Sequence, residues 1–554
     1  MMRKLFKWLG LGLLTVGLLL TGAIGYLYWA AVHHHPTPPA SALLSQQPQS
    51  LAKNSTVLGP NWLRQSRSGW WEMHLEGGPY ERGLANGILC RDLCEYQEEA
   101  FVGQLRQLVP SAFYRQFLKY MIAVFNRHLD GSLTEEQRLE IYGVAQTANP
   151  KFDEIGPAYP RLMNYHAAHD IGHALQNLAL VGCSSFATWG DKSADGQLLI
   201  GRNFDFYAGD RFADNKVVDF VTPAQGHRFV TVSWCGMSGV VSGMNMAGLT
   251  ITLNAAKSEI PTGSATPISL LAREILQYAG TIDEALAIAR QRHTFVSESL
   301  LIGSAADNKA VVIEKTPDAL DVYDPGQQSL ICTNHYQSPG LVNTALNQQN
   351  MRESASVYRQ QRIAELMERA GPLSPTKAAS ILRDQRGLGD RFIGYGNEKA
   401  VNQLICHHSV IFQPAKRIIW LAAAPWQLGK FVAYDLNKVF AMKTPTIDHE
   451  LVEVDSIAAD PFLRSPGYQD FVAFRALVAR LKNHEAVDPM ELIRLNPEYY
   501  HAYVLAGDAL FRDKKFDEAR KVYSIGLTKE IASKGEEMHL RKQLAKCEEL
   551  LQGA

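Results

Sequence analysis

The sequence of 554 residues has almost no net charge and no long basic run. Its 55 Lys and Arg residues are balanced by 56 Asp and Glu residues, so the formal net charge is −1. Proteins that bind nucleic acid through phosphate contacts usually carry a basic patch or stripe. The sequence therefore does not indicate a nucleic-acid partner, and none is expected.

Cysteine is also scarce. There are seven cysteines, and they lack the paired spacing that is typical of metal sites. Cys90 and Cys94 lie four apart in a segment with helical periodicity, which favours two helix residues over a metal or disulfide motif. An odd number of cysteines leaves at least one thiol unpaired. No disulfide framework and no cofactor are expected.

One long apolar run is present, at the N-terminus. Three basic residues, Arg3, Lys4 and Lys7, precede a nearly unbroken apolar run from Trp8 to Val32. This run is long enough to cross a bilayer as a helix. Residues 1–35 are therefore expected to be a membrane anchor, or a signal if the chain is cleaved after Ala30-Ala31-Val32. The basic flank would leave the rest of the chain on the extracytoplasmic side, periplasmic or extracellular.

Composition and periodicity divide the rest of the chain into four segments. Residues 36–68 are rich in Pro, Ser and Gln and are expected to be a linker. Residues 69–182 are expected to be mainly helical, residues 183–445 mainly strands, and residues 446–554 helical. Helices are predicted at about 88–108, 111–128, 135–147, 267–292, 353–370 and 375–384.

The predicted strands lie between residues 197 and 422. Short alternating apolar runs recur there, for example Arg228 to Trp234, Leu249 to Leu253 and Ile418 to Ala422. Strands in series with helices between them indicate an α+β protein with a layered sheet sandwich.

The C-terminal segment contains a pair of helical patterns. Residues 496–511 and 516–527 have the spacing of small and aromatic residues that is typical of one tetratricopeptide-like repeat. One such repeat cannot bury its own apolar face, so it must pack on neighbouring helices or on the rest of the chain. A protein partner at this repeat is a further expectation.

The chemistry is expected around Gly182 and Cys183. An apolar strand-like run follows Cys183, Asp195-Gly196 marks a turn, and a second strand carries Arg202 and Asp205. Such a hairpin would bring Cys183 toward positions 205–208. A cationic neighbour lowers the pKa of a thiol and favours the nucleophilic thiolate. An ordinary hairpin with a surface Arg and Asp is the alternative.

Four ordered segments resemble the N-terminal-nucleophile (Ntn) cysteine hydrolases. They are Gly182-Cys183 with Gly201-Arg-Asn-Phe-Asp205, Gly243-Met-Asn-Met-Ala-Gly-Leu249 with Thr252-Leu-Asn254, Cys332-Thr-Asn-His-Tyr336, and Ser356-Val-Tyr-Arg359. This superfamily includes choloylglycine hydrolases, penicillin V acylase, acid ceramidase and the acyl-CoA:6-aminopenicillanic acid acyltransferases. The resemblance spans about residues 183–425 and implies a four-layer αββα sandwich.

The resemblance also implies roles for individual residues. Cys183 would be the nucleophile, Arg202 would lie against the thiolate, and Asp205 would hold the α-amine of Cys183. Asn254 and Asn334 resemble the residues that shape the oxyanion hole, with Asn245 as a rival to Asn254. Arg359 resembles an arginine that braces the pocket, whereas His335 is expected to be a core residue.

In this reading the chain processes itself. Cys183 would attack the Gly182 carbonyl, and hydrolysis would release a chain that begins at Cys183. The mature enzyme would cleave or transfer the acyl group of a small N-acyl substrate through an acyl-thioester. A site close to a membrane makes lipid-like substrates reasonable.

Two other functions remain open on the sequence alone. The chain could be a membrane-tethered scaffold with a degenerate catalytic domain and a partner-binding repeat. It could also be a zinc hydrolase, because His169 and His173 are one helical turn apart. Aspartate replaces the glutamate of the usual zinc motif, however, and no third ligand is evident, so the main prediction includes no metal.

Overall fold

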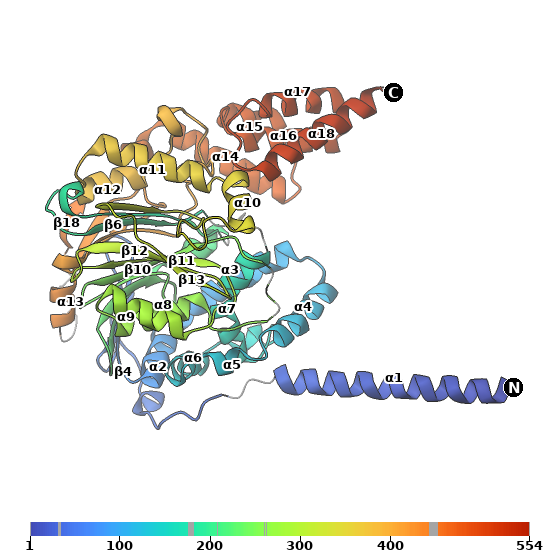
Figure 1. Ribbon diagram of the computed structural model, residues 1–554, viewed down its shortest axis with the longest axis horizontal. Coiled ribbons are helices and arrows are strands. Elements are labelled where there is room, and N and C mark those ends of the chain that lie inside the picture. The colour runs from blue at the N-terminus through green and yellow to red at the C-terminus, as the bar shows by residue number, and fades with distance from the viewer. Residues whose placement is uncertain are drawn as a thin grey trace.

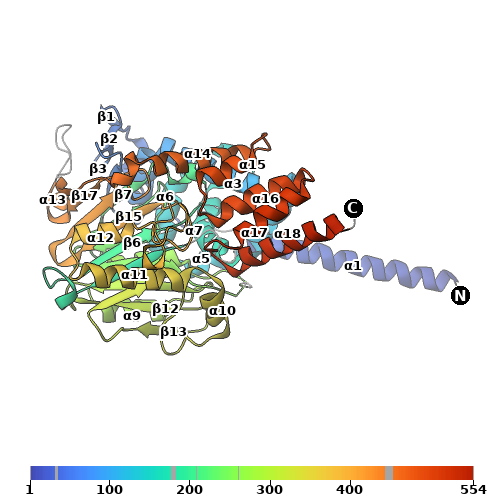
Figure 2. The same ribbon diagram turned by 90° about the horizontal axis from the view of Figure 1, so that it is seen from above.

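The structure is a computed structural model that describes residues 2–31, 35–175, 182–207, 209–259, 261, 263–442 and 453–552. Two β-sheets are stacked face to face, with helices on their outer faces (Figure 1). The C-terminal helices lie at one side of this body, and helix α1 (Met2–Ala31) points away from it in both views (Figures 1 and 2). This arrangement agrees with the expected α+β layered sandwich.

Within the described ranges, the larger sheet has 11 strands. All neighbours in it are antiparallel except β4 and β7, which pair in parallel. In spatial order the strands are β1 (Gln49–Ala52), β2 (Ser55–Leu58), β3 (Asn61–Gln65), β4 (Trp71–Gly77), β7 (Val217–Pro223), β8 (Phe229–Ser233), β9 (Ser242–Asn245), β10 (Leu249–Ala255), β11 (Glu298–Ser304), β12 (Lys309–Lys315) and β13 (Leu320–Tyr323).

The smaller sheet has seven strands in the described part of the chain, all antiparallel to their neighbours. In spatial order they are β14 (Ser329–Cys332), β5 (Ser184–Thr188), β6 (Leu199–Phe204), β15 (His408–Gln413), β16 (Ile418–Ala422), β17 (Phe431–Asp435) and β18 (Glu453–Ile457). Strands β5 and β6 are fully buried along their length because both faces of this sheet are covered.

Three apolar clusters hold four layers together. One lies between the sheets and includes Ile200, Val230 and Phe412. A second packs α8 (Ile268–Tyr278) and α9 (Ile282–Gln291) on the larger sheet, and a third packs α11 (Ser356–Ala370) and α12 (Pro375–Leu382) on the smaller one. The helix expected at 267–292 is therefore two helices, because α8 ends before Gly280 and Thr281 caps α9.

The segment before Cys183 is only partly as expected. Residues 36–68 were expected to be a linker, but they contain β1, β2 and β3, and β4 extends the larger sheet into the segment expected to be helical. Both expectations are wrong at these strands. Their Ser- and Gln-rich composition is typical of a linker, but the strands are stabilised by pairing along the sheet edge and, through β4, with the distant strand β7. The helices of this segment are α2 (Pro79–Leu89), α3 (Arg91–Leu108), α4 (Ala112–Phe125), α5 (Leu129–Ser132), α6 (Glu135–Ala145) and α7 (Ala158–Leu175).

Helices α2 and α6 pack with their backbones in contact. A Cβ on Gly83 would lie 2.0 Å from the Glu140 carbonyl oxygen, and a Cβ on Gly143 would lie 2.5 Å from the Tyr80 carbonyl oxygen. Only glycine allows this approach. The buried pair of Arg82 and Glu140 ties the same two helices together. This packing forms a rigid helical layer next to the larger sheet.

The C-terminal segment is helical, as expected, apart from β18, which belongs to the smaller sheet. The boundary predicted at residue 445 therefore falls before the last strand of the sandwich. The helices are α14 (Pro466–Lys482), α15 (Pro489–Leu495), α16 (Tyr500–Arg512), α17 (Phe516–Gly526) and α18 (Lys534–Gln552). Helices α16 and α17 form the expected helical pair, and its assignment as a tetratricopeptide-like repeat stays a prediction.

Helix α1 covers most of the apolar run at the N-terminus, and its described side chains are exposed. In the part of the chain that the structure describes, none of the helices meets the length and hydropathy needed to cross a bilayer. The predicted membrane anchor is thus not confirmed.

Candidate active site

Cys183 is buried and lies immediately before β5. Strand β5 pairs with β6 so that Ser184 faces Asn203 and Ser185 faces Arg202. The Gly182 N–H donates to the Asp205 carbonyl at 3.1 Å, which continues the same register. The predicted hairpin is confirmed. Cys183 lies opposite position 204, one residue earlier than the first position expected.

The Arg202 side chain is completely buried beside the cysteine. Its Nη2 lies 3.6 Å from the Cys183 sulfur and also donates to the Leu253 carbonyl. Its Nη1 donates to the Val241 carbonyl and to Ser242 Oγ, and its guanidinium carbon lies 4.6 Å from the centre of the Phe204 ring. The guanidinium is therefore held rigidly with one edge toward the sulfur.

Burial raises the pKa of the Cys183 thiol, while the Arg202 charge lowers it and the Asp205 charge raises it. Burial is the largest of these effects. The thiol of the intact chain is therefore protonated at neutral pH, and Arg202 offsets part of the cost of ionising it.

Asp205 is buried without a hydrogen-bond partner for either carboxylate oxygen among the described residues. Burial raises its pKa to about 7, although the Arg359 and Arg202 charges lower it. A buried carboxylate that lacks partners is costly. A positive group placed next to Asp205 would remove this cost and lower its pKa.

Arg359 lies on the other side of the Gly182–Cys183 peptide. Its Nη1 donates to the Gly182 carbonyl at 2.7 Å and to the Cys183 carbonyl at 2.6 Å. Its Nη2 donates to Asn334 Oδ1 at 2.6 Å. Burial lowers the pKa of Arg359 to about 10, so the side chain remains charged at neutral pH. Arg359 therefore polarises the carbonyl on which the predicted self-cleavage depends.

Of the two predicted oxyanion-hole residues, Asn254 lies in β10 and Asn334 lies two residues after the end of β14. Asn254 Nδ2 donates to the Cys332 carbonyl at 3.1 Å, and Asn254 Oδ1 accepts from Ser185 Oγ at 2.9 Å. Asn334 Nδ2 donates to the Ala255 carbonyl at 2.8 Å. The structure thus brings Cys183, Arg202, Asp205, Asn254, Asn334 and Arg359 into one buried network.

The two residues that were set aside in the sequence are structural. Asn245 Nδ2 donates to the Leu276 and Ala279 carbonyls, which fixes the end of α8. His335 Nδ1 lies 2.8 Å from Ser356 Oγ, and burial lowers its pKa to about 4, so its ring is neutral. Asn245 thus does not compete with Asn254 for the site.

Sequence reasoning missed two groups at the site. Gln403 Nε2 donates to the Gly182 carbonyl at 2.8 Å from a loop 221 residues away. His408 Nε2 lies 2.8 Å from Ser242 Oγ, the hydroxyl that also contacts Arg202. Neither residue lies in a recognisable motif, and only the pairing of β15 with β6 brings this region to the cysteine.

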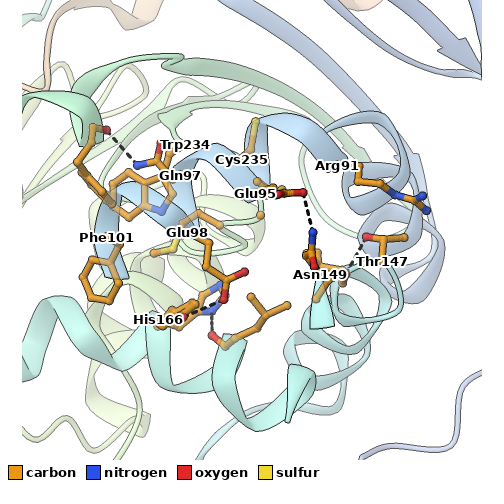
Figure 3. Close-up of a pocket in the computed structure, with 18 of the residues that line it drawn as sticks. Arg91, Glu95, Gln97, Glu98, Phe101, Thr147, Asn149, His166, Trp234 and Cys235 are labelled. Atoms are coloured by element: carbon orange, nitrogen blue, oxygen red, sulfur yellow. Dashed lines mark hydrogen bonds between the residues drawn. The ribbon is translucent and has the colours of Figure 1, made fainter. Parts of the chain in front are cut away.

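A cavity of about 110 Å³ adjoins the site (Figure 3). The residues that line it come from before and after Cys183 in the sequence: α3 contributes Phe101, and the chain after β8 contributes Trp234. Phe206 also lines it and stacks on Phe204 at 5.8 Å between ring centres. Phe204 in turn covers the Arg202 guanidinium. The cavity is therefore mainly apolar and separated from the Arg202 side of the site by two aromatic rings.

One lining residue, Glu98, belongs to a fixed charge pair. Glu98 forms an ion pair with Arg161, with Nε and Oε1 2.7 Å apart, and accepts from the Tyr165 hydroxyl at 2.8 Å. His166 bonds the Leu162 carbonyl and the Ser238 N–H, and burial lowers its pKa, so it is neutral. Because these polar groups already have protein partners, the rest of the wall suits an apolar ligand.

Among the residues with described positions, no group of three His, Cys, Asp or Glu side chains could hold a metal ion. The side chains of His169 and His173 lie outside the described residues. The zinc alternative is therefore not tested by the described residues.

Comparison with known proteins finds a family model that matches the central part of the chain. Residues 192–425 match the family model of acyl-coenzyme A:6-aminopenicillanic acid acyl-transferase. The matched region includes Arg202, Asp205, Asn254, Asn334 and Arg359, and it begins after Cys183.

Three relatives have similar sequences. N-acylethanolamine-hydrolyzing acid amidase of Caenorhabditis elegans is 26% identical over 284 residues, which cover 48% of this chain and 73% of that protein. An uncharacterized protein of Archaeoglobus fulgidus is 27% identical over 271 residues, 46% of this chain and 45% of that protein. Protein dcd1B of Dictyostelium discoideum is 24% identical over 272 residues, 46% of this chain and 51% of that protein. The match thus spans about half the length of the last two relatives.

Solved structures of low sequence identity also align. The Caenorhabditis elegans N-acylethanolamine-hydrolyzing acid amidase ortholog has 18% identity and a TM-score of 0.31 and covers 42% of this chain and 93% of its own. A mutant of the conjugated bile acid hydrolase from Clostridium perfringens has 14% identity and a TM-score of 0.32 and covers 49% of this chain and 96% of its own.

Proposed function

From the match of residues 192–425 to the family model of acyl-coenzyme A:6-aminopenicillanic acid acyl-transferase, we propose that the chain is a self-processing cysteine amidohydrolase or acyltransferase. Cys183 is the nucleophile, and it acts after cleavage of the Gly182–Cys183 bond. The substrate is a small N-acyl compound with an amide bond.

One observation carries this proposal most directly. The Cys183 sulfur has Arg202 at 3.6 Å, and next to it the buried Asp205 carboxylate has no hydrogen-bond partner among the described residues. A new α-ammonium at Cys183 would supply the positive charge that Asp205 lacks. The intact chain thus contains a negative group whose natural partner is formed only by cleavage.

In the first reaction the Cys183 sulfur attacks the Gly182 carbonyl carbon. The S–C bond forms, the C–N bond of the peptide breaks, and the thiol proton passes to the Cys183 nitrogen. The product is a thioester, which water hydrolyses to a Gly182 carboxylate and a free Cys183 thiol. Asp205, with a pKa of about 7, is suited to carry the proton between sulfur and nitrogen.

The mature enzyme repeats this chemistry on a substrate. The α-amine of Cys183 accepts the thiol proton and then gives a proton to the leaving amine. Arg202 favours the thiolate, and Asn254 and Asn334 support the donors that stabilise the tetrahedral oxyanion. Water or an acceptor amine then resolves the acyl-thioester, which yields either hydrolysis or transfer.

The cavity next to Phe206 supports an apolar acyl group as the substrate part that the enzyme recognises. Phe101, Trp234 and Met237 are among the apolar side chains that line it. The amidase similarity over 284 residues supports an N-acyl amide, including lipid-like ones. The intact network around Cys183 argues against a degenerate scaffold.

Intact mass and N-terminal sequencing test the proposal. The purified wild-type protein is expected to consist of residues up to 182 and a second chain that begins at Cys183, whereas Cys183→Ala remains one chain. Cys547→Ala, at a buried cysteine in α18, is the matched control and should be cleaved normally. An active wild-type protein that stays uncleaved would disprove the proposal.

A second measurement tests the reaction. Incubation with N-acyl amides should release free amine, and brief acid quenching should trap an acyl group on the Cys183 peptide by mass. Release of amine without any acyl-thioester, including in single-turnover conditions, would contradict covalent catalysis at Cys183.

Three further features remain proposals about location and partners. The apolar run at residues 8–32 anchors the protein in a membrane, the catalytic part lies on the extracytoplasmic side, and the α16–α17 pair binds a protein partner. Carbonate extraction and protease protection of membrane vesicles test the first two. A wild-type protein that carbonate removes from membranes would contradict the anchor.

A further inference from the structure

We propose that Gln403 is a catalytic residue of self-cleavage, and that the C-terminal helices hold its loop in place. This inference rests on the proposed cleavage at Cys183. It assigns Gln403 and the C-terminal segment a role in that reaction, although no sequence motif indicates such a role.

Two side chains bind the carbonyl that must be attacked. Gln403 Nε2 donates to the Gly182 oxygen at 2.8 Å, and Arg359 Nη1 donates to it at 2.7 Å. Both side chains are buried, with exposed fractions of 2% and 3%. Preorganised donors in a buried site stabilise the negative charge that develops on such an oxygen. Arg359 also binds the Cys183 carbonyl and Ser184, whereas among the described residues the Gln403 side chain bonds only Gly182.

The absence of a side chain at Gly182 is what leaves room for this amide. A Cβ at Gly182 would lie 2.2 Å from Gln403 Nε2, 2.5 Å from Oε1 and 2.8 Å from Cδ. Any other residue at 182 would push the amide away from the carbonyl. The glycine before the nucleophile and the distant glutamine therefore form one unit.

The loop of Gln403 runs between α12 and β15 and is fixed locally on one side. The Asn402 N–H donates to the Asp384 carbonyl at 2.8 Å, and Asn402 Oδ1 accepts from the Leu404 N–H at 2.9 Å. These bonds set the backbone on both sides of Gln403. They do not by themselves hold the preceding residues 391–400, which have no strand or helix.

The C-terminal helices supply that second support. Asn496 forms two bonds with the backbone of Tyr395, accepting from its N–H at 3.1 Å and donating to its carbonyl at 2.8 Å. Arg475 Nη1 donates to the Leu404 carbonyl at 3.1 Å, directly after Gln403. Lys399 forms an ion pair with Glu530 at 2.6 Å. The loop is therefore clamped between the sandwich and helices α14 to α18.

These contacts define what Gln403 does in the reaction. When the Cys183 sulfur bonds to the Gly182 carbon, the carbonyl electrons move to oxygen, and the Gln403 and Arg359 donors stabilise that oxyanion. The electrons return when the C–N bond breaks and the thiol proton has reached the nitrogen. Gln403 gives up no proton and needs no co-reactant.

Gln403→Met tests the role, since methionine has a similar length and no amide donor. The precursor is made by cell-free translation, and its conversion to two chains is followed by intact mass. Cleavage is expected to be about 10²-fold slower than in the wild type, the usual effect of removing one oxyanion donor. Gln427→Met is the matched control, because Gln427 is a buried amide that donates to the Leu382 carbonyl instead.

Gln403→Glu separates donation from a merely structural role. A protonated carboxyl can donate to the Gly182 oxygen and an ionised one cannot, so this variant should cleave faster at low pH relative to the wild type. Gln427→Glu should not show this relative pH dependence. Hydroxylamine, which intercepts thioesters, should not restore Gln403→Met, because the first attack is the slow step.

The outcomes distinguish this inference from the proposed function. A wild-type chain that is never cleaved contradicts self-cleavage itself. A cleaved wild type together with Gln403→Met cleaved at the same rate overturns only the role of Gln403. If Gln403→Met has a lowered unfolding midpoint, the pH profile of Gln403→Glu decides the role of Gln403. A profile parallel to that of the wild type would overturn it.

The support from the C-terminal helices is tested in the full chain with Asn496→Ala. Losing the clamp on Tyr395 should slow cleavage about tenfold or more, because small misplacements of a catalytic group are costly. Asp508→Asn is the control, since Asp508 bonds Tyr523 and His539 within the helices. Equal cleavage rates for Asn496→Ala and the wild type would overturn this part.

Discussion

The Arg202 guanidinium lies 3.6 Å from the Cys183 sulfur and is fixed there by bonds to Val241, Ser242 and Leu253. These bonds leave the cation little freedom to move away from the thiol. The charge is therefore preorganised, and its effect on the thiolate does not depend on a mobile surface contact.

Arg202→Lys is expected to lower the kcat/KM of the mature enzyme about 10²-fold. A lysine ammonium is compact and cannot bind three acceptors while one edge faces the sulfur. The pKa of the Cys183 thiol should rise, which the pH dependence of alkylation by iodoacetamide measures. Arg228→Lys, at an exposed position that contacts the Phe440 carbonyl, is the control. An unchanged alkylation profile in Arg202→Lys would refute this role.

Asp205 should make the uncleaved chain less stable as the pH rises from about 4 to 7. Its pKa is about 7 in the folded chain and 3.8 as the ordinary value, so the folded state binds more protons across this interval. The unfolding free energy therefore falls with rising pH and levels off above about 7. Urea unfolding of Cys183→Ala with and without Asp205→Asn measures this difference.

In that experiment the double variant should lack the extra pH dependence, because asparagine does not titrate. All other groups are the same in both proteins, so the difference between the two curves isolates Asp205. Parallel curves between pH 4 and 8 would contradict the raised pKa.

The two chains formed by cleavage are expected to remain associated. Strand β4 pairs with β7 over Trp71–Gly77 and Val217–Pro223, so the N-terminal chain supplies four strands of the larger sheet. Glu72, in the larger sheet, also accepts a hydrogen bond from the hydroxyl of Tyr434 in the smaller sheet at 2.9 Å. Gel filtration should show one species in native buffer and two in concentrated guanidinium chloride. Two species in native buffer would contradict this.

The cavity next to Phe206 predicts selectivity for acyl length. Ala148→Trp should fill part of it and raise KM for long-chain N-acyl amides more than for short-chain ones. Losing space for about two methylene groups costs about 1.6 kcal/mol, which is about tenfold in KM. Steady-state kinetics over a series of acyl lengths measures this effect. Gln146→Trp at a neighbouring exposed position is the control, and equal effects of both variants at all lengths would contradict the assignment.

Local pattern was sufficient for most elements of the sandwich. The alternation in residues 228–234, 249–253 and 418–422 predicted β8, β10 and β16 because those strands are set by apolar residues near one another in the sequence. Strands β1 to β4 were missed because their stability comes from pairing along the sheet and with β7, which no local pattern contains.

The same division applies to the site. Cys183, Arg202 and Asp205 are within 23 consecutive positions, so one hairpin and a family resemblance were enough to group them. Gln403 and His408 were not predicted. They reach the site only because β15 pairs with β6 and the preceding loop folds back over Gly182.

The sequence alone grouped Cys183 with Arg202 and Asp205 and predicted the layered fold, since these depend on short spacings and on which residues are apolar. Only the tertiary structure decided which groups surround the Gly182–Cys183 bond: Arg359 and Gln403 on its carbonyl, and Asp205 without a partner beside it. Those contacts join segments up to 221 residues apart. Burial and directed hydrogen bonds affect these groups only after folding has brought the segments together.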